Sequence, residues 1–172
     1  MRHIINNTDH SVINLDCLTY AGNKDSVSVG ESSERYFFKT MLRLGAVRDE
    51  LSIVGDQIGC PTYAQDIAKA IVSMMTQLND GSSASGTFHY CGDQLYSWYE
   101  FARVIFEEAK MSGFQTPGLI HSIQTSDYPT AAERSGYSAL DCHKIRNTFG
   151  INTSDWKLGV KNVVSNFHLV KF

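Results

Sequence analysis

The chain has 172 residues, of which 42% are hydrophobic and 19% charged, and its formal net charge at pH 7 is -3. This length suffices for one domain with a sizeable core, and the balance of apolar and charged residues excludes wholesale disorder. Because the basic residues are scattered among acidic ones, nothing in the composition favours binding to nucleic acid or to an anionic membrane.

The spacing of apolar residues predicts strands that alternate with helices. In chain order these elements are a strand at 11–16, a helix at 34–47, a strand at 51–54, a helix after the turn-rich residues 55–62, a strand at 87–91, a helix from 97, a strand at 119–124, a short helix after 141 and a last helix after 154. Loops are expected at 26–33, 79–86 and 125–136. Such alternation is typical of an α/β domain.

Local signals mark the ends of several predicted helices. Ser97 and Glu100 have the spacing of a capping box, in which each side chain satisfies an amide at the helix start. Asp141 is expected to cap the short helix, which Gly150 ends. A hydroxyl of the Thr-Ser pair at 153–154 is expected to cap the last helix.

The sequence lacks a glycine-rich turn of the kind that binds a nicotinamide cofactor. In a Rossmann fold the backbone must approach the pyrophosphate without interference from a Cβ. None of the 13 glycines belongs to a GxGxxG or GxxGxxG pattern. Gly55 and Gly59 come nearest, but a cysteine and a proline follow them rather than a helix. We therefore expect that this chain by itself does not bind NADPH or NADH.

No catalytic group is well indicated either. Short-chain dehydrogenases use a Tyr as general acid and a Lys four residues later, so that both project from one helical face. Tyr20 and Lys24 have this spacing, but the Gly-Asn pair at 22–23 favours a turn, and we interpret them as non-catalytic. His89 is interpreted as a strand residue with a local partner rather than as a base.

The cysteines favour a reducing compartment. Cys17, Cys60, Cys91 and Cys142 form no CxxC pair and have no histidine nearby at the spacing of a zinc site. Each lies in a locally apolar or strand-like stretch, where a free thiol behaves as a small core residue. With no signal peptide at the start and no stretch of roughly twenty apolar residues, we expect a soluble cytoplasmic protein without a metal site.

Six segments carry a resemblance to a known family. They are KTMLRL (39–44), LSIVGDQIGCPTYAQDIA (51–68), FHYCGD (88–93), SWYEFA (97–102), TSDYPT (125–130) and YSALDC (137–142). From about residue 37 onward the chain resembles the carboxyl part of bacterial dTDP-4-dehydrorhamnose reductases, which are extended short-chain dehydrogenases. The resemblance implies an incomplete Rossmann-type fold, made of the substrate lobe and the trailing sheet elements. It also implies the last step of dTDP-L-rhamnose biosynthesis for surface polysaccharide, the NADPH- or NADH-dependent reduction of a 4-keto sugar nucleotide.

The same resemblance implies roles for four residues in sugar-nucleotide binding. Pro61, Thr62 and Tyr63 match the turn that lines the cleft, although a turn that merely starts a helix is an alternative interpretation. Arg134 lies in the loop before YSALDC, where its guanidinium suits a diphosphate. The family has a proline directly after this arginine, whereas this chain has Ser135, and a solvent-exposed arginine is the alternative.

The first 36 residues resemble the early part of dTDP-glucose 4,6-dehydratase instead. In that resemblance SVINLD at 11–16 is the second Rossmann strand, and Asp16 is the acid that holds the adenosine ribose of the cofactor. We therefore divide the chain into a dehydratase-like remnant at 1–36 and a sugar-nucleotide-binding part at 37–172. The family's catalytic Tyr and Lys would lie in a part that is missing before residue 37.

These observations predict a truncated reductase homologue that is inactive alone. The alternative is a non-catalytic module that binds a dTDP-sugar or docks onto a partner. Without a cofactor lobe, apolar helix faces and strand edges would be exposed, and self-association usually covers such surfaces. We expect a homo-oligomer, or association with an intact enzyme of the same pathway.

Overall fold

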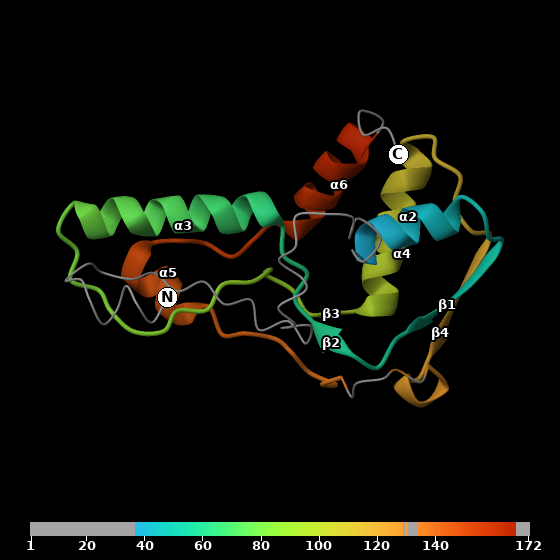
Figure 1. The fold of residues 1–172 in the computed structure, drawn as a ribbon, viewed down its shortest axis with the longest axis horizontal. Helices are drawn as coiled ribbons and strands as arrows, with labels where there is room; N and C mark the ends of the chain where they lie inside the picture. Colours follow the sequence, from blue (N-terminus) through green and yellow to red (C-terminus); the bar gives the residue numbers. More distant parts are fainter. Residues whose placement is uncertain (1–36, 129, 131–133, 168–172) are drawn as a thin grey trace, which may run out of the picture. The chain divides into compact units, whose positions relative to one another are not determined.

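The computed structural model describes residues 37–128, 130 and 134–167. The chain divides into two units, residues 1–34 and 35–172, and the described residues belong to the second. The helices are α2 (Phe37–Gly45), α3 (Ala64–Asn79), α4 (Trp98–Met111), α5 (His143–Phe149) and α6 (Trp156–Phe167), with a 3-10 turn η2 at Thr125–Asp127 (Figure 1). The strands are β1 (Glu50–Val54), β2 (Ile58–Gly59), β3 (Tyr96–Ser97) and β4 (Leu119–Ile123). No helix among the described residues is long and apolar enough to cross a bilayer.

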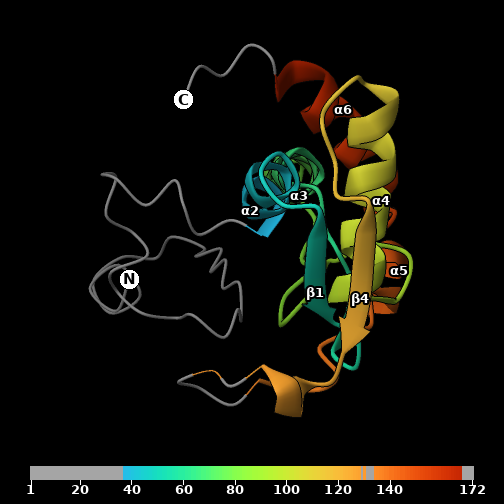
Figure 2. The same cartoon turned by 90° about the vertical axis from the view of Figure 1, so that its right-hand side faces the viewer.

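Two strands far apart in the sequence form the parallel pair of the fold. β1 and β4 run in the same direction, in register from Glu50 opposite Leu119 to Val54 opposite Ile123, as Figure 2 shows. Parallel strands need a long crossover connection, and here α3 and α4 lie between them in the chain. β2 and β3 form a second, antiparallel pair of two residues each. The predicted α/β class is confirmed.

The larger hydrophobic core joins the parallel pair to three helices. We call it the large core, and its buried residues are Met41, Leu42, Leu51, Ile53, Ala102, Ile105, Phe106, Ala109, Trp156, Val160 and Val164. On α4 and α6 they recur three to four positions apart, and on β1 they occupy every second position, which is why one face of each of these elements is apolar. The Trp156 ring meets the rings of Tyr96 and Phe101 edge-on, at centroid distances of 4.7 and 5.5 Å.

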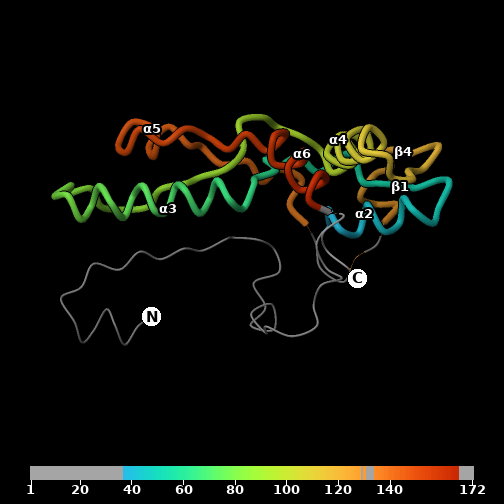
Figure 3. Tube along the Cα trace, turned by 90° about the horizontal axis from the view of Figure 1, so that it is seen from above, coloured from blue at the N-terminus to red at the C-terminus, as the bar shows by residue number. Residues whose placement is uncertain are grey.

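A smaller core lies where α5 runs beside α3 (Figure 3). We call it the small core, and its buried residues are Cys91, Cys142, Ile145 and Phe149. Phe88 packs edge-on against Phe149, at a centroid distance of 5.0 Å. The side chain of Gln77 on α3 donates a hydrogen bond to the Phe149 carbonyl at 2.9 Å, which ties the end of α5 to the longer helix.

Two predicted helix signals are confirmed. The Ser97 hydroxyl accepts the Glu100 amide at 3.1 Å while the Glu100 carboxylate accepts the Ser97 amide at 2.8 Å, which is the complete capping box of α4. Gly150 ends α5 in the left-handed conformation, with φ at 68°. The Asp141 carboxylate accepts the His143 amide at 2.8 Å, although Cys142 occupies the N-cap position itself.

The prediction of a hydroxyl cap for α6 is wrong. The Asp155 carboxylate accepts the Leu158 amide at 3.1 Å and takes that place. The Ser154 hydroxyl instead accepts the Tyr63 amide at 3.0 Å and donates to the Asp66 carboxylate at 2.9 Å, so it ties the start of α3 to the start of α6.

The predicted strand at 87–91 is also wrong. These residues belong to no strand, and only the following residue, Gly92, forms an isolated parallel bridge, to Ser154. A strand needs a neighbouring strand that pairs with it along its length. Here the segment between α5 and α6 provides a single backbone hydrogen bond, in which the Ser154 amide donates to the Cys91 carbonyl at 3.1 Å. His89 is therefore an exposed residue of an irregular segment.

Candidate functional site

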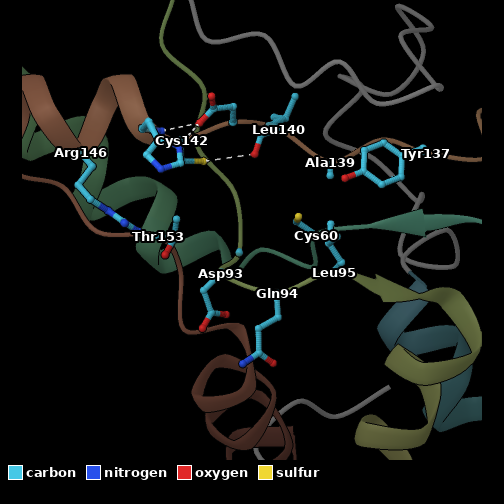
Figure 4. A pocket seen from close by; sticks show the side chains of 13 residues that line it. Cys60, Asp93, Gln94, Leu95, Tyr137, Ala139, Leu140, Cys142, Arg146 and Thr153 are labelled. Atoms are coloured by element: carbon cyan, nitrogen blue, oxygen red, sulfur yellow. Dashed lines mark hydrogen bonds and ion pairs between the residues drawn. The ribbon is translucent and has the colours of Figure 1, made fainter.

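A cavity of about 560 Å³ lies beside the small core, between three loops and the start of α5 (Figure 4). Its walls come from the residue after β2, the loop at 92–95, the segment at 137–142, the first turn of α5 and the segment before α6. The lining residues are Cys60, Gly92, Asp93, Gln94, Leu95, Tyr137, Ala139, Leu140, Asp141, Cys142, His143, Arg146 and Thr153.

Gly92 fixes the position of one cavity wall. A Cβ at this position would collide with the Pro61 carbonyl oxygen and would lie 2.9 Å from the Trp156 ring. The Gly92 amide donates to the Thr62 hydroxyl at 3.2 Å. Only glycine allows the chain to pass this close to the turn before α3, and the loop at 92–95 continues from this contact.

None of the predicted residues Pro61, Thr62 and Tyr63 lines the cavity, whereas the preceding residue, Cys60, does. The Thr62 hydroxyl donates to the Cys60 carbonyl at 2.9 Å. Tyr63 is the N-cap residue of α3, and its ring packs against Gly159 of α6, where an added Cβ would lie 2.5 Å from the ring. The turn thus starts α3, and its Thr62 hydroxyl links two cavity-lining residues, Cys60 and Gly92. Its contact with a sugar nucleotide stays a prediction.

Arginines occupy two different positions relative to the cavity. Arg134, the predicted diphosphate ligand, is exposed and does not line the cavity. Arg146 lines it from the last turn of α5 and forms no ion pair with any other described residue (Figure 4). An exposed guanidinium with five donors in a planar fork is suited to a phosphate or diphosphate group.

Acidic and neutral polar groups complete the lining. His143 Nδ1 lies 2.6 Å from the Asp141 carboxylate, and hydrogen bonds from the His143 amide and ring lower the pKa of Asp141. The Gln94 amide and the Thr153 hydroxyl supply groups that can bond to sugar hydroxyls. The cavity therefore offers one cationic fork, that of Arg146, together with two carboxylates, those of Asp93 and Asp141, so an anionic group of a ligand would bind at Arg146.

A clamp at the ends of β1 and β4 sets the start of the loop that carries Arg134. The Asp56 carboxylate accepts the Thr125 amide at 3.0 Å and the Thr125 hydroxyl at 2.6 Å. The buried Gln57 side chain donates to the same hydroxyl at 3.1 Å. The hydrogen bonds from Thr125 lower the pKa of Asp56. The GDQ and TSD segments, 69 residues apart, meet here at the carboxyl ends of the parallel strands.

Neither of the two glycines that come nearest to the cofactor pattern forms a turn for a dinucleotide. A Cβ at Gly55 would collide with the Ser122 hydroxyl, and one at Gly59 would lie 2.8 Å from the Ser138 hydroxyl, so these glycines serve packing within the protein. No helix follows Gly55, and thus no helix N-terminus is available there for a pyrophosphate. Asp16, Tyr20 and Lys24 lie outside the described residues. Within the part that the structure describes, no group of three or more His, Cys, Asp or Glu side chains could hold a metal ion.

The comparison with known families decides the relationship. The family model described as RmlD substrate binding domain matches residues 27–169. The chain belongs to the RmlD substrate binding domain family. The match starts within the segment at 1–36 that the sequence assigned to a dehydratase-like remnant, and it includes the whole of the cavity.

Individual relatives of this family are reductases. The dTDP-4-dehydrorhamnose reductase of Aggregatibacter actinomycetemcomitans is 43% identical over 129 residues, which are 74% of this chain and 44% of that protein. The solved structure of the reductase from Clostridium acetobutylicum has a TM-score of 0.66 at 32% identity, and covers 77% of this chain and 44% of its own.

The reductase from Bacillus anthracis, solved in complex with NADP, has a TM-score of 0.60 at 35% identity, and covers 73% of this chain and 41% of its own. The fold predicted from the resemblance is thus the fold that the reductases share with this chain. The chain spans less than half the length of the relatives it matches.

Sequence reasoning did not single out most of the cavity. Asp93 ends the FHYCGD motif and Asp141 lies within YSALDC, so membership in these motifs could have indicated them. Arg146 lies one helical turn after Cys142 and belongs to none of the matched motifs. The only signal for it was an arginine in a short helix directly behind a matched segment, and that signal is weak.

Proposed function

We propose that this chain is the sugar-nucleotide-binding part of a dTDP-4-dehydrorhamnose reductase of dTDP-L-rhamnose biosynthesis, and that the cavity receives the dTDP-sugar. The observation that carries the proposal is the match of residues 27–169 to the RmlD substrate binding domain, a segment that includes every wall of the cavity. The alternative, a dTDP-sugar-binding module without catalysis of its own, uses the same site.

The cavity has the size and the groups that such a ligand requires. A volume of about 560 Å³ lies within the usual range for small-molecule sites. Arg146 supplies a charge-assisted pair of hydrogen bonds for the diphosphate. The exposed Tyr137 ring at the rim offers an apolar face to a pyrimidine, while Gln94 and Thr153 can bond to sugar hydroxyls.

Calorimetric titration with dTDP tests the site. We expect binding to the intact chain that Arg146→Gln weakens at least about tenfold, because a hydrogen bond between charged groups is lost. Arg103→Gln is the matched control, since Arg103 lies exposed on α4 and pairs with Glu107 at 3.4 Å, and it should leave binding unchanged. Equal loss in both variants, or no dTDP binding at all, would contradict the proposal.

The same titration resolves the role of the predicted residues. Under the proposal Arg134 reaches the diphosphate from the loop that the Asp56–Thr125 clamp positions, and Arg134→Gln then weakens dTDP binding as well. If only Arg146→Gln weakens binding, the diphosphate is held from α5 alone and the prediction for Arg134 is wrong.

We propose that these 172 residues bind the sugar nucleotide without reducing it. The described residues form no turn for the pyrophosphate of a nicotinamide cofactor, so no reduction step is assigned to them. The test incubates the chain with NADPH and dTDP-4-dehydrorhamnose and follows the absorbance of reduced nicotinamide. Steady oxidation of NADPH that depends on the sugar nucleotide would contradict this part of the proposal.

Three finer statements also belong to the proposal. Residues 1–36 derive from a dTDP-glucose 4,6-dehydratase, for which SVINLD is the supporting motif. The protein acts in the cytoplasm, which the free thiols of Cys60, Cys91 and Cys142 support. The chain self-associates, or binds an intact pathway enzyme, through exposed apolar residues such as Val72 and Met75, and a light-scattering mass of one chain at micromolar concentration would contradict self-association.

A further inference from the structure

Three cysteines that are distant in the sequence lie at the cavity or in the small core beside it. Cys60 and Cys142 line it, and Cys91 lies behind them in the small core. All three are free thiols. The Cys91 and Cys142 sulfurs are 3.5 Å apart, although 51 residues separate them in the chain.

The backbone holds the two sulfurs at this distance. The Cys91 carbonyl accepts the Ser154 amide at 3.1 Å, and the Cys142 carbonyl accepts the Arg146 amide at 3.2 Å in the first turn of α5. Both thiols also point toward the Leu140 carbonyl, at 3.5 and 3.9 Å. The segments that carry the two thiols are therefore both held in place by backbone hydrogen bonds.

We propose that Cys91 and Cys142 are an oxidative modification site, at which a peroxide converts the two thiols into an intramolecular disulfide. In the first step the Cys142 thiol and hydrogen peroxide give a sulfenic acid and one water. In the second step Cys91 sulfur attacks the sulfenic sulfur, the S–S bond forms, and the hydroxyl leaves with the Cys91 proton as a second water. Two thiols are oxidised and one peroxide is reduced, so the step balances.

The geometry favours this product. A disulfide bond is about 2.05 Å long, so the sulfurs must approach by roughly 1.5 Å from their 3.5 Å contact. The cavity provides the route for the oxidant, since Cys142 lines it whereas Cys91 does not. The new bond would replace the thiol hydrogen bonds to Leu140, which is itself a cavity wall.

Burial makes the reaction slow near neutral pH. Desolvation, followed by the neighbouring Cys142 thiol, raises the pKa of Cys91 to about 12. The thiolate is the nucleophile in disulfide formation, and the fraction of Cys91 in this form increases as the pH rises. The inference does not depend on which ligand the cavity binds.

Peptide mapping of the intact chain tests the modification site. Cleavage after Lys and Arg places Cys60, Cys91 and Cys142 on three separate peptides, 49–69, 70–103 and 135–144. After treatment with hydrogen peroxide we expect the 70–103 and 135–144 peptides to be linked within one chain, and dithiothreitol to release them. The linked pair should form equally in Cys60→Ser, which keeps both members of the pair and serves as the control.

Three outcomes would overturn the proposal. They are a predominant link between Cys91 and Cys60, links between different chains only, and stepwise oxidation of Cys142 to sulfinic acid while Cys91 stays a free thiol. In Cys142→Ser the peptide 70–103 should remain unlinked. The wild-type map decides the question even if that variant does not fold.

Discussion

The large core and the small core differ in size and in their position relative to the cavity. The large core contains eleven buried residues, which come from α2, α4, α6 and β1. The small core contains four buried residues, two of which are cysteines. The candidate cavity borders the small core, which contributes Cys142 directly to its lining. Apolar area removed from water provides most of the stability, so the unit is stabilised mainly at one place and the proposed binding site lies at another.

This difference predicts where the protein opens first. Regions with little buried apolar surface exchange their amide hydrogens through low-energy local openings, while a large core opens only with the whole unit. We therefore expect faster exchange in α5 than in α4. Substitutions in the large core, in the small core, at their junction and outside both should therefore differ in their effects.

Removal of the Trp156 side chain should have the largest effect on stability. Trp156 is 2% exposed and meets Tyr96 and Phe101, so Trp156→Ala leaves a large cavity in the large core. We expect the free energy of unfolding to fall by about 4 kcal/mol, measured by urea denaturation. Leu158→Ala on the same helix is the control, because Leu158 is 52% exposed and its loss should cost under about 0.5 kcal/mol. Similar losses in both variants would show that α6 is not anchored by Trp156.

Phe149→Ala tests the small core by itself. The Phe149 ring is 5% exposed and packs against Phe88, and its removal should cost about 3 kcal/mol. Hydrogen exchange should show lost protection in α5 and in the adjoining part of α3, with α4 unchanged. Equal loss of protection in α4 would mean that the two cores open as one cooperative unit, and the comparison would fail.

Gly92→Ala tests the point at which the two cores meet. Gly92 follows Cys91 of the small core and contacts the Trp156 ring of the large core, and a Cβ there collides with the Pro61 carbonyl. Overpacking of this kind should cost about 2 kcal/mol, and it should weaken dTDP binding because the loop at 92–95 shifts. Gly118→Ala is the control, since its Cβ would have an ordinary 3.8 Å contact with the Asp49 carbonyl. Unchanged stability and binding in Gly92→Ala would refute the close approach.

The smallest effect is a pH dependence at the Asp56–Thr125 clamp, which lies outside both cores. Hydrogen bonds from Thr125 lower the folded-state pKa of Asp56 below its ordinary 3.8. A lowered folded pKa means that the carboxylate contributes stability above the unfolded pKa and loses that contribution as the pH falls through the folded value. The stability difference between the wild type and Asp56→Asn should therefore be constant near pH 6 and shrink below about pH 4.

Denaturation of both proteins over that pH range measures this difference. Thr125→Val provides the matched change, because it removes the hydroxyl that bonds to Asp56 but leaves the carboxylate in place. A difference that stays the same from pH 6 to pH 3 would mean that the clamp does not form in solution.

Features whose causes lie within a few neighbouring residues could be predicted from the amino-acid sequence. The capping box of Ser97 and Glu100, the left-handed Gly150 and the apolar spacing of α4 and α6 follow from local hydrogen bonds and side-chain periodicity. The strands at 50–54 and 119–123 were predictable for the same reason. Their parallel pairing was not, because nothing in either segment alone indicates its partner. The family resemblance was also carried by short motifs, and it named the α/β class correctly.

Which of those segments contact one another could be seen only in the folded chain. Residues 87–91 have the composition of a strand but no strand beside them, and Ser154 has the hydroxyl of a helix cap but bonds to Tyr63 and Asp66 instead. Arg146 becomes a cavity residue, and Cys91 a neighbour of Cys142, through contacts between segments that are far apart in the chain. A local pattern indicates which kinds of partner a residue can bond. The fold determines which partner it has, because a buried polar group can bond only to the groups that packing brings within hydrogen-bond distance.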